Sequence, residues 1–254
     1  MRIAIVGGSG TLGRHITAQL TEHGHDVRVL SRGSPEFPVD LVSGSGLPAA
    51  LTGCAAVVDA SNASAPKCAA RVLVEGSRRL LAAEQQAGVV HHVCISIVGC
   101  ERAPMGYYRV KAEQEQVVER GPVPWTIVRA TQFHELAAAA LTAAGRFGVL
   151  PIPPLRIQTV AAAEVAAVAA EVAEGGPRLG RVEVAGPEIT SARDLARTWR
   201  AVTGRRALLV PLPVPGRLGR ALRDGALTTA RPDVHGTVTF GAWLASTAAA
   251  AAAS

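Results

Sequence analysis

A glycine-rich segment near the N-terminus constrains the fold more than any other part of the chain. Gly7, Gly10 and Gly13 form the pattern Gly-x-x-Gly-x-x-Gly, directly after the apolar run 3–6 and before a helical pattern over 12–22. Such glycines permit a tight turn, a close approach of the backbone to a pyrophosphate, and close packing of the helix on the strand. The helix N-terminus adds unpaired N–H groups that bind phosphate oxygens. Because strand, loop and helix come in this order, the segment predicts a dinucleotide-binding loop.

Strand and helix patterns alternate through the first half of the 254-residue chain, which is typical of a parallel sheet covered by helices. We predict an α/β fold, a doubly wound parallel sheet of the Rossmann type with a small C-terminal substrate-binding portion. The expected strands are 3–6, 26–30, 37–41, 55–59, 92–96 and 126–129, and the expected helices are 12–22, 47–51, 69–87 and 107–119.

The pattern loosens after Phe133. The later expected elements are helices at 135–144, 163–173 and 191–203 and strands at 158–160 and 182–185. We predict a dinucleotide-binding core at 1–134 and a smaller substrate-binding portion at 135–245, of which 156–186 returns to the core. The Ala-rich residues 246–254 are set aside as a tail.

Composition and charge argue against several classes of function. The net charge is +6, but the arginines are scattered and only 4% of the residues are aromatic. The chain therefore offers neither a groove-reading motif nor a stacking platform for nucleic acid. The Ala-rich run 137–144 is too short to cross a membrane. Because the chain opens directly with a strand rather than a signal peptide, we expect a cytoplasmic protein that acts on a small molecule. A homodimer is compatible with these features.

The cysteines and histidines do not predict a metal site. His91 and His92 would point to opposite faces of the strand expected around them, and no second ligand pair follows. We therefore expect no bound metal, and a reducing compartment. The four cysteines, none of them in a Cys-x-x-Cys pair, are Cys54, Cys68, Cys94 and Cys100.

The end of the second expected strand indicates which dinucleotide binds. Sites for NAD usually carry an acidic residue there to bind the ribose hydroxyls. This chain has Ser31 and Arg32 instead. A hydroxyl and a guanidinium suit the 2′-phosphate of NADP, which a carboxylate would repel. The sequence therefore favours NADPH as the cofactor.

A tyrosine and a lysine with helical spacing provide a candidate catalytic pair. Tyr107 and Lys111 are four residues apart on an expected helix, so they share a face. A nearby ammonium would lower the pKa of the phenol from about 10 toward neutrality and make Tyr107 a proton donor to a carbonyl oxygen. Ser96, after the fifth expected strand, would hold the same oxygen by a hydrogen bond. Tyr108 is the competing proton donor.

With these motifs in order, the chain resembles the short-chain dehydrogenase/reductases, and in particular the atypical branch near the NmrA-like proteins. The resemblance covers residues 1–200 and implies an NADPH-dependent reductase of the carbonyl, or of the conjugated enone or quinone, of a small organic molecule. Asp59-Ala60-Ser61-Asn62 belongs to the motifs of the broad resemblance, and the segments that narrow it to the atypical branch are Gly44-x-Gly46-Leu47, Val128-Arg129-Ala130-Thr131-Gln132-Phe133 and Val184-Ala185-Gly186-Pro187.

The resemblance also implies which residues touch the ligands. Asp40 would lie near the adenine, and Thr131 would border the nicotinamide. The expected cofactor contacts are Gly7, Ser9, Gly10, Thr11, Leu12, Gly13, Ser31, Arg32, Asp40, Ala60, Ser61, Asn62, Lys111 and Thr131, and the expected substrate contacts are Gln132 and Phe133.

Two departures from the family pattern leave alternatives open. Leu73 stands where the broader superfamily often has an Asn, and the gap between Ser96 and Tyr107 is short. One alternative is a non-catalytic NmrA-like redox sensor that binds NADP and a protein partner. The other is an isomerase or cyclase that uses Tyr107 as an acid and leaves the cofactor unconsumed. The intact pair of Tyr107 and Lys111 favours the reductase.

Overall fold

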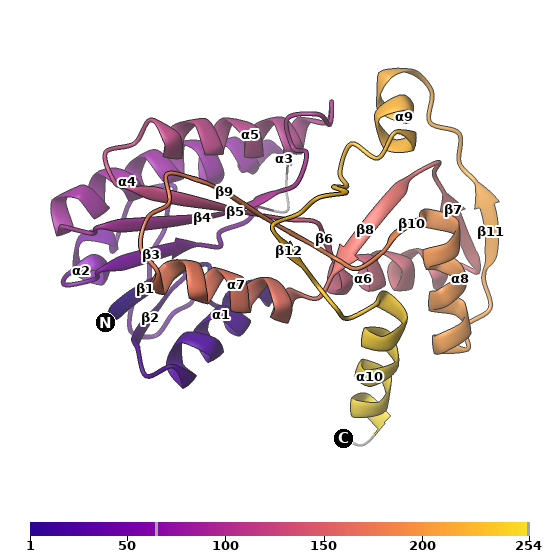
Figure 1. Cartoon of the computed structure of the whole chain (residues 1–254), viewed down its shortest axis with the longest axis horizontal. Coiled ribbons are helices and arrows are strands. Elements are labelled where there is room, and N and C mark those ends of the chain that lie inside the picture. Colours follow the sequence, from indigo (N-terminus) through magenta and orange to yellow (C-terminus); the bar gives the residue numbers. More distant parts are fainter. Residues whose placement is uncertain (64–65, 253–254) are drawn as a thin grey trace. The chain divides into compact units, whose positions relative to one another are not determined.

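The computed structural model describes residues 1–63 and 66–252, and its main feature is a seven-stranded parallel sheet (Figure 1). The strand order is β12-β9-β5-β4-β3-β1-β2. The strands β2 and β3 pair with opposite edges of β1, so the strand order reverses there, and in sheets of this kind ligands bind outside the carboxyl ends of the strands at such a point. The strands are β1 (Arg2–Val6), β2 (Asp26–Leu30), β3 (Ala56–Asp59), β4 (His91–Ile97), β5 (Trp125–Ala130), β9 (Gly180–Ala185) and β12 (Val234–His235).

Helices cover both faces of this sheet, which confirms the predicted doubly wound fold. In Figure 1, α1 and α7 lie on one face, and α4 and α5 lie on the other. The helix α1 buries Leu12, Ile16 and Leu20, which are four residues apart and so form one apolar stripe. The helices of this part of the chain are α1 (Thr11–Glu22), α2 (Leu47–Leu51), α3 (Pro66–Ala69), α4 (Gly76–Ala87), α5 (Gly106–Glu119) and α7 (Ala162–Glu174).

The chain divides into two compact units. The first comprises the described residues of 1–96, 106–129 and 163–182, and the second those of 97–105, 130–162 and 183 onward. The second unit has its own core, in which Trp199 is fully buried and packs with Leu150, Leu195 and Phe240.

Two small sheets, of order β10-β8-β6 and β11-β7, belong to the second unit. Ser191 begins its helix α8 as an N-cap, because its side chain accepts a hydrogen bond from the amide of Asp194. Its elements are β6 (Gln132–Phe133), α6 (His134–Gly145), β7 (Val149–Ile152), β8 (Arg156–Val160), β10 (Ile189–Ser191), α8 (Ala192–Thr203), β11 (Leu208–Pro211), α9 (Gly216–Arg223) and α10 (Phe240–Ala252).

The prediction of a strand at 37–41 is wrong. This segment forms only isolated bridges, between Ser31 and Pro38 and between Asp40 and Ser45. A tight turn ends it, in which Gly46 has a φ of +82°, and a Cβ there would lie 2.2 Å from the carbonyl oxygen of Pro38. The loop folds back on itself over these few residues, so it cannot extend along the sheet.

The helix expected at 69–87 is also not uniform. Residues Ala70–Glu75 form a π-helical turn, η1, between α3 and α4. Such turns widen a helix locally and often lie next to functional sites. Here the turn places Leu73 and Val74 in the interior.

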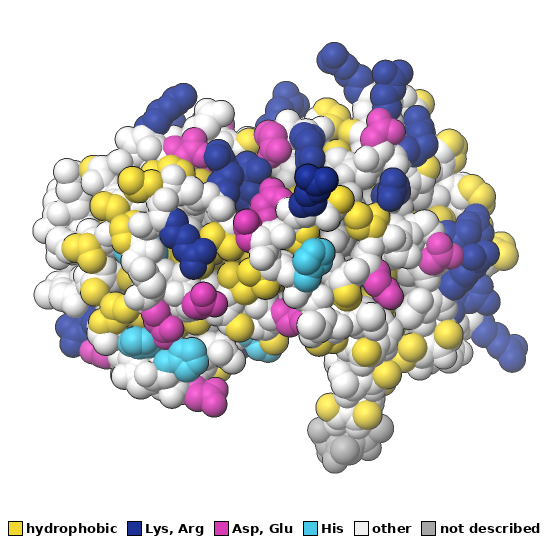
Figure 2. Space-filling view, in the orientation of Figure 1, with side chains coloured by type: hydrophobic (Ala, Val, Ile, Leu, Met, Phe, Trp, Pro, Cys, Tyr) yellow, Lys and Arg dark blue, Asp and Glu magenta, His cyan; other side chains and the backbone are white. Residues whose placement is uncertain are grey.

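The Ala-rich C-terminal residues are helical where the structure describes them. Residues 246–252 continue α10 as a helix, and residues 253 and 254 lie outside the described part. No helix among the described residues is long and apolar enough to cross a membrane. On the face shown in Figure 2, Lys and Arg side chains lie in separate groups with acidic side chains between several of them, which agrees with the scattered arginines of the sequence.

Candidate active site

The glycine-rich loop connects β1 to α1 at the point where the strand order of the sheet reverses. Gly7 has a φ of +74°, and its amide donates a hydrogen bond to Leu30 at 2.8 Å. A Cβ at Gly7 would lie 2.8 Å from the carbonyl oxygen of Ala60, so the loop touches the segment after β3. Gly10 serves as the N-cap of α1 without any side-chain capping bond, and the first turn of the helix begins at Thr11. The loop therefore presents a helix N-terminus of the kind that binds phosphate.

Gly10 and Gly13 differ in what surrounds them. A Cβ at Gly13 would lie 2.3 Å from the carbonyl oxygen of Gly7, so only glycine allows α1 to pack this closely. A Cβ at Gly10 would meet a single atom within 4 Å, the same oxygen, at 3.2 Å. Gly13 is thus required by the packing, whereas Gly10 leaves space beside the loop into which a pyrophosphate fits.

Ser31 and Arg32 follow β2 directly. The carbonyl of Ser31 accepts hydrogen bonds from the amides of Ser34 and Val39, which holds the loop beneath it. Arg32 is exposed and forms no hydrogen bond or ion pair with any described residue. Its guanidinium is thus available to an anionic ligand. The carboxylate of Asp40 instead accepts the amide of Val42 at 2.9 Å and stabilises its own turn.

The segment after β3 is held by a buried carboxylate. Asp59 is fully buried and accepts the amide of Ser61 at 3.0 Å. The hydroxyl of Ser61 is buried and has no hydrogen-bond partner among the described residues. The side-chain oxygen of Asn62 accepts the amide of Ala63 and the phenol of Tyr107, both at 2.7 Å. This segment, Ala60 to Asn62, therefore joins the glycine-rich loop to the candidate proton donor.

The expected lowering of the Tyr107 pKa is not found. Burial, with a contribution from the neighbouring Tyr108, raises the pKa of Tyr107 to about 12. The phenol donates to Asn62 rather than contacting Lys111. The helical spacing does place Tyr107 and Lys111 on α5, but the two side chains end at different groups.

Lys111 is held inside a buried polar network. Its ammonium donates to the carbonyl of Ile95 at 2.7 Å and to the side chain of Gln114 at 2.6 Å. The amide of Gln114 in turn donates to Asp59 at 3.1 Å and to Ser77 at 3.0 Å. The positive charge of Lys111 and the negative charge of Asp59 are thus linked through one neutral side chain, which explains how both can be buried.

Ser96 also points away from its expected partner. Its hydroxyl donates to Glu115 at 2.5 Å, and Arg129 donates two hydrogen bonds to the same carboxylate, at 2.9 and 2.6 Å. Burial opposes the charge of Glu115, but the hydrogen bonds from Arg129 and Ser96 outweigh it and lower the pKa of this carboxyl. The hydroxyl of Ser96 thus completes a buried ion pair, and its role in holding a carbonyl oxygen stays a prediction.

Three further predicted residues lie in the second unit. The hydroxyl of Thr131 accepts the amide of Gly186 at 3.2 Å, so it supports the chain after β9. Gln132 has two buried side-chain polar atoms without a hydrogen-bond partner among the described residues. Phe133 is half-buried and is the N-cap of α6. Of the three, Gln132 is the one whose side chain can still bind a ligand.

His91 and His92 contact different groups, as their alternation predicts. The ring of His92 bonds the buried carboxylate of Glu84 at 2.9 Å, whereas that of His91 lies 3.0 Å from the hydroxyl of Thr126. Burial, with a contribution from His92, lowers the pKa of His91 to about 4. Thr126 already accepts the amide of Arg178, so its hydroxyl proton is available for a neutral His91.

Sequence reasoning missed several residues around this site. Asp59 belongs to the motif 59–62, which predicts no role of its own for it, and no local pattern marks Gln114 and Glu115, which follow Lys111 on α5. Arg14 could have been found, because it follows the last glycine of the loop; it donates to the carbonyl of Ser9 at 3.0 Å and so stabilises the loop.

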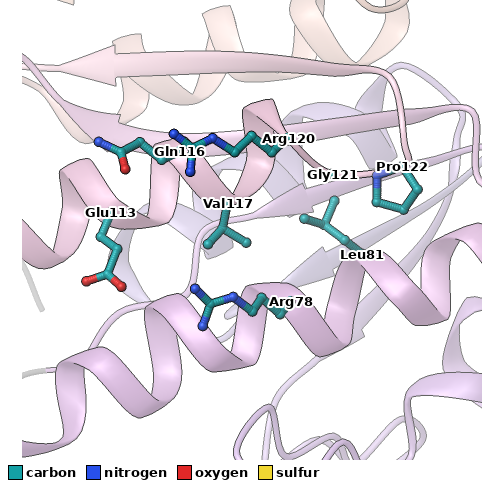
Figure 3. A pocket seen from close by; sticks show the side chains of 8 residues that line it. All are labelled: Arg78, Leu81, Glu113, Gln116, Val117, Arg120, Gly121 and Pro122. Carbon is teal, nitrogen blue, oxygen red and sulfur yellow. The ribbon is translucent and has the colours of Figure 1, made fainter.

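A separate hollow of about 370 Å³ lies on the outer surface between α4 and α5. Figure 3 shows the side chains of Arg78, from α4, and Glu113, from α5, beside Val117, with Leu81 on the other side of Val117. None of its lining residues belongs to the predicted cofactor or substrate set, so this hollow is not the site described above.

The loop, the unpaired Arg32 and the Asp59–Asn62 segment suit a dinucleotide. Residues 7–175, two thirds of the chain, match the family described as NAD(P)H-binding. The chain belongs to the NAD(P)H-binding family. This confirms the expected NAD(P)-binding protein of the Rossmann type.

Proteins similar in sequence to this chain differ in what they do. A (4-alkanoyl-5-oxo-2,5-dihydrofuran-3-yl)methyl phosphate reductase of Streptomyces griseus is 29% identical over 222 residues, which cover 80% of this chain and 74% of that protein. A photosystem II assembly factor of Synechocystis is 31% identical over 174 residues, 63% of this chain and 51% of that protein. The NADPH complex of an Escherichia coli quinone oxidoreductase superposes with a TM-score of 0.77 at 19% identity, covering 96% of this chain and 99% of that one. At that identity the structural match shows the fold alone.

Proposed function

We propose that the protein is an NADPH-dependent reductase of a small organic carbonyl compound, or of a conjugated enone or quinone. The observation that carries this proposal is the contact between Tyr107 and Asn62. It puts a phenol, the only kind of proton donor that the sequence predicts, against the segment that would line a bound dinucleotide. The family supports cofactor binding, and the named reductase relative supports the reaction class.

The residues present fit NADPH. The loop at Gly7 and Gly10 would hold the pyrophosphate, and Arg32 with Ser31 would bind the 2′-phosphate, because a guanidinium forms strong charge-assisted hydrogen bonds with phosphate. The segment Ala60–Asn62 would lie along the cofactor. When bound, the reduced nicotinamide supplies hydride to the substrate.

Tyr107 would supply the proton that balances the hydride. Its pKa, raised to about 12, keeps the phenol protonated at neutral pH, so it still carries the proton for the oxygen of the reduced carbonyl, as a weaker acid than the sequence predicted. Releasing this proton requires the phenol to exchange Asn62 for the substrate oxygen. Lys111 lies on the same helix. Its ammonium donates to the carbonyl of Ile95 in β4 and to the side chain of Gln114, and the bond to β4 fixes the position of α5.

NADPH oxidation followed against a panel of quinones, ketones and enones tests the proposal. We expect turnover of at least one class, and Tyr107→Phe should lower it by about 10²–10⁴-fold while cofactor affinity stays nearly constant. Tyr108→Phe is the matched control, since its ring lies 5.8 Å from that of Tyr107. If Tyr108→Phe alone abolishes turnover, Tyr108 is the donor. If neither change slows the reaction, the reductase mechanism is overturned.

A non-catalytic NADP-binding sensor is the second candidate. Ser96 and Lys111 are both engaged in buried contacts, and the phenol of Tyr107 donates to Asn62, so each of the three expected catalytic side chains already has a partner. For a sensor, calorimetry would detect NADPH binding, and none of the quinones, ketones or enones would cause NADPH oxidation.

We also place the protein in a reducing compartment such as the cytoplasm. All four cysteines carry free thiols, and Cys54, Cys94 and Cys100 are buried. Proteins of oxidising compartments more often pair such residues in disulfides.

A further inference from the structure

A hydroxyl-lined cavity in the second unit has no role in the proposed reaction. Its volume is about 220 Å³. It is smaller than the roughly 300–1,000 Å³ of sites that hold a whole drug-sized ligand, so it suits one part of a small molecule. Threonines from three elements line it: Thr159 of β8, Thr190 of β10 and Thr198 of α8.

A buried hydroxyl without a partner among the described residues lines the cavity, and an unpartnered amide lies next to it in the sheet. Thr159 is only 4% exposed, and its hydroxyl makes no hydrogen bond to any described residue. Gln132 is its register partner across β6 and β8, so the two side chains project from the same face of the sheet. Both polar atoms of the Gln132 amide are buried and without a partner among the described residues. Gln132 is not among the residues that line the cavity, so the hydroxyl of Thr159 is the group that indicates a ligand there, because buried polar groups are normally hydrogen-bonded.

The turn after β9 holds one wall in place. A Cβ at Gly186 would lie 1.7 Å from the carbonyl oxygen of Thr159, so only glycine fits here. The carbonyl of Gly186 also accepts the side chain of Gln158 at 2.8 Å. This anchoring delivers Pro187 and Glu188 to the edge of the cavity and gives the motif at 184–187 a structural reason.

The opposite wall is the start of α10. The side chain of Thr239 accepts the amide of Ala242, which caps the helix. The amides of Phe240 and Gly241, which line the cavity in the first turn of α10, donate to no described residue. They add two donors to the threonine hydroxyls, which both donate and accept.

The charges select the class of ligand. No Lys, Arg or His lines the cavity, and the exposed Glu188 lies at its edge, so a phosphate would have no cation and would face a carboxylate. A cation would face the positive end of α10. We propose that this cavity binds an uncharged, polyhydroxylated part of a small molecule. The proposal does not depend on hydride transfer.

Titration of the isotopically labelled full chain with xylitol, a neutral polyol, tests the proposal. We expect saturable shifts of the amide resonances of Thr159, Phe240 and Gly241, all of which line the cavity. Inorganic phosphate and methylammonium, the charged probes, should give no saturable shift. The proposal is overturned if xylitol leaves these resonances unchanged, or if only a charged probe shifts them.

Variants connect the shifts to the cavity. Thr159→Val and Thr198→Val should each weaken xylitol binding about five- to tenfold, the loss expected for one hydrogen bond, without changing NADPH affinity. Thr247→Val is the matched control, because Thr247 is exposed on α10 and bonds the carbonyl of Trp243. If Thr159→Val does not fold, Thr198→Val, at a half-buried helix position, carries the test. Unchanged xylitol affinity in the folded variants would contradict the assignment.

Discussion

Gly13 packs against Gly7 so closely that a Cβ at Gly13 would lie 2.3 Å from the Gly7 carbonyl oxygen. This distance is far below any real contact between a Cβ and an oxygen, so the helix α1 can begin where it does only if residue 13 is glycine. The phosphate loop is thus shaped by the packing of its own ends.

Gly13→Ala should therefore lower the free energy of unfolding by more than about 2 kcal/mol, the scale at which core overpacking acts. Gly10→Val should leave the chain folded but abolish dinucleotide binding, because its side chain would occupy the space of the pyrophosphate. Urea unfolding and calorimetry measure the two effects. Gly33→Ala, where a Cβ meets nothing within 4 Å, is the matched control. A folded Gly10→Val protein with wild-type cofactor affinity would refute the assignment of the loop.

Arg32→Ala should discriminate between the two nicotinamide cofactors. Loss of one charge-assisted hydrogen bond to the 2′-phosphate would weaken NADPH binding by about 1.5–3 kcal/mol and leave NADH binding almost unchanged. Calorimetry with both cofactors measures this. Arg200→Ala, at an exposed position of α8, serves as the control for loss of net charge. Equal losses for NADPH and NADH would exclude a 2′-phosphate contact.

Glu115→Gln should destabilise the fold strongly. The Glu115 carboxylate is buried and accepts hydrogen bonds from Arg129 and Ser96, so neutralising it weakens a buried ion pair. We expect a loss of on the order of 3 kcal/mol in unfolding free energy. Glu119→Gln, on the same helix and in a more exposed pair with Arg181, should lose less than about 1 kcal/mol. If chemical denaturation gave the two variants similar losses of unfolding free energy, the buried ion pair of Glu115 would stabilise the fold no more than the more exposed pair of Glu119.

The free energy of unfolding should decrease as the pH falls from about 6.5 to about 4, because of His91. Its pKa is about 4 in the folded protein, below its ordinary value of 6.5. Within this window the unfolded chain takes up a proton that the folded chain does not, so falling pH favours unfolding, by up to about 3 kcal/mol. His91→Gln keeps a polar side chain next to Thr126 but does not titrate. Urea unfolding across this range should give the variant a shallower pH dependence, and parallel curves would contradict the prediction.

Local sequence patterns predicted the glycine-rich loop, the first two strands, α1 and the long helix that carries Tyr107. These features depend on neighbours within one or two turns: glycine conformation, apolar spacing and the order of strand, loop and helix. The segment 37–41 misled the prediction, because its few apolar residues lie in a loop that closes on Gly46.

By itself, the sequence determined that this chain builds a doubly wound sheet with a dinucleotide loop, and it placed Tyr107 and Lys111 on one helix. Only the tertiary structure decided which groups their side chains meet. Lys111 is satisfied by Ile95 and Gln114, and Gln114 by Asp59, 55 residues away in the chain. The physical reason is that a buried polar group bonds whichever partner the packing brings within reach, and no spacing in the sequence encodes that choice.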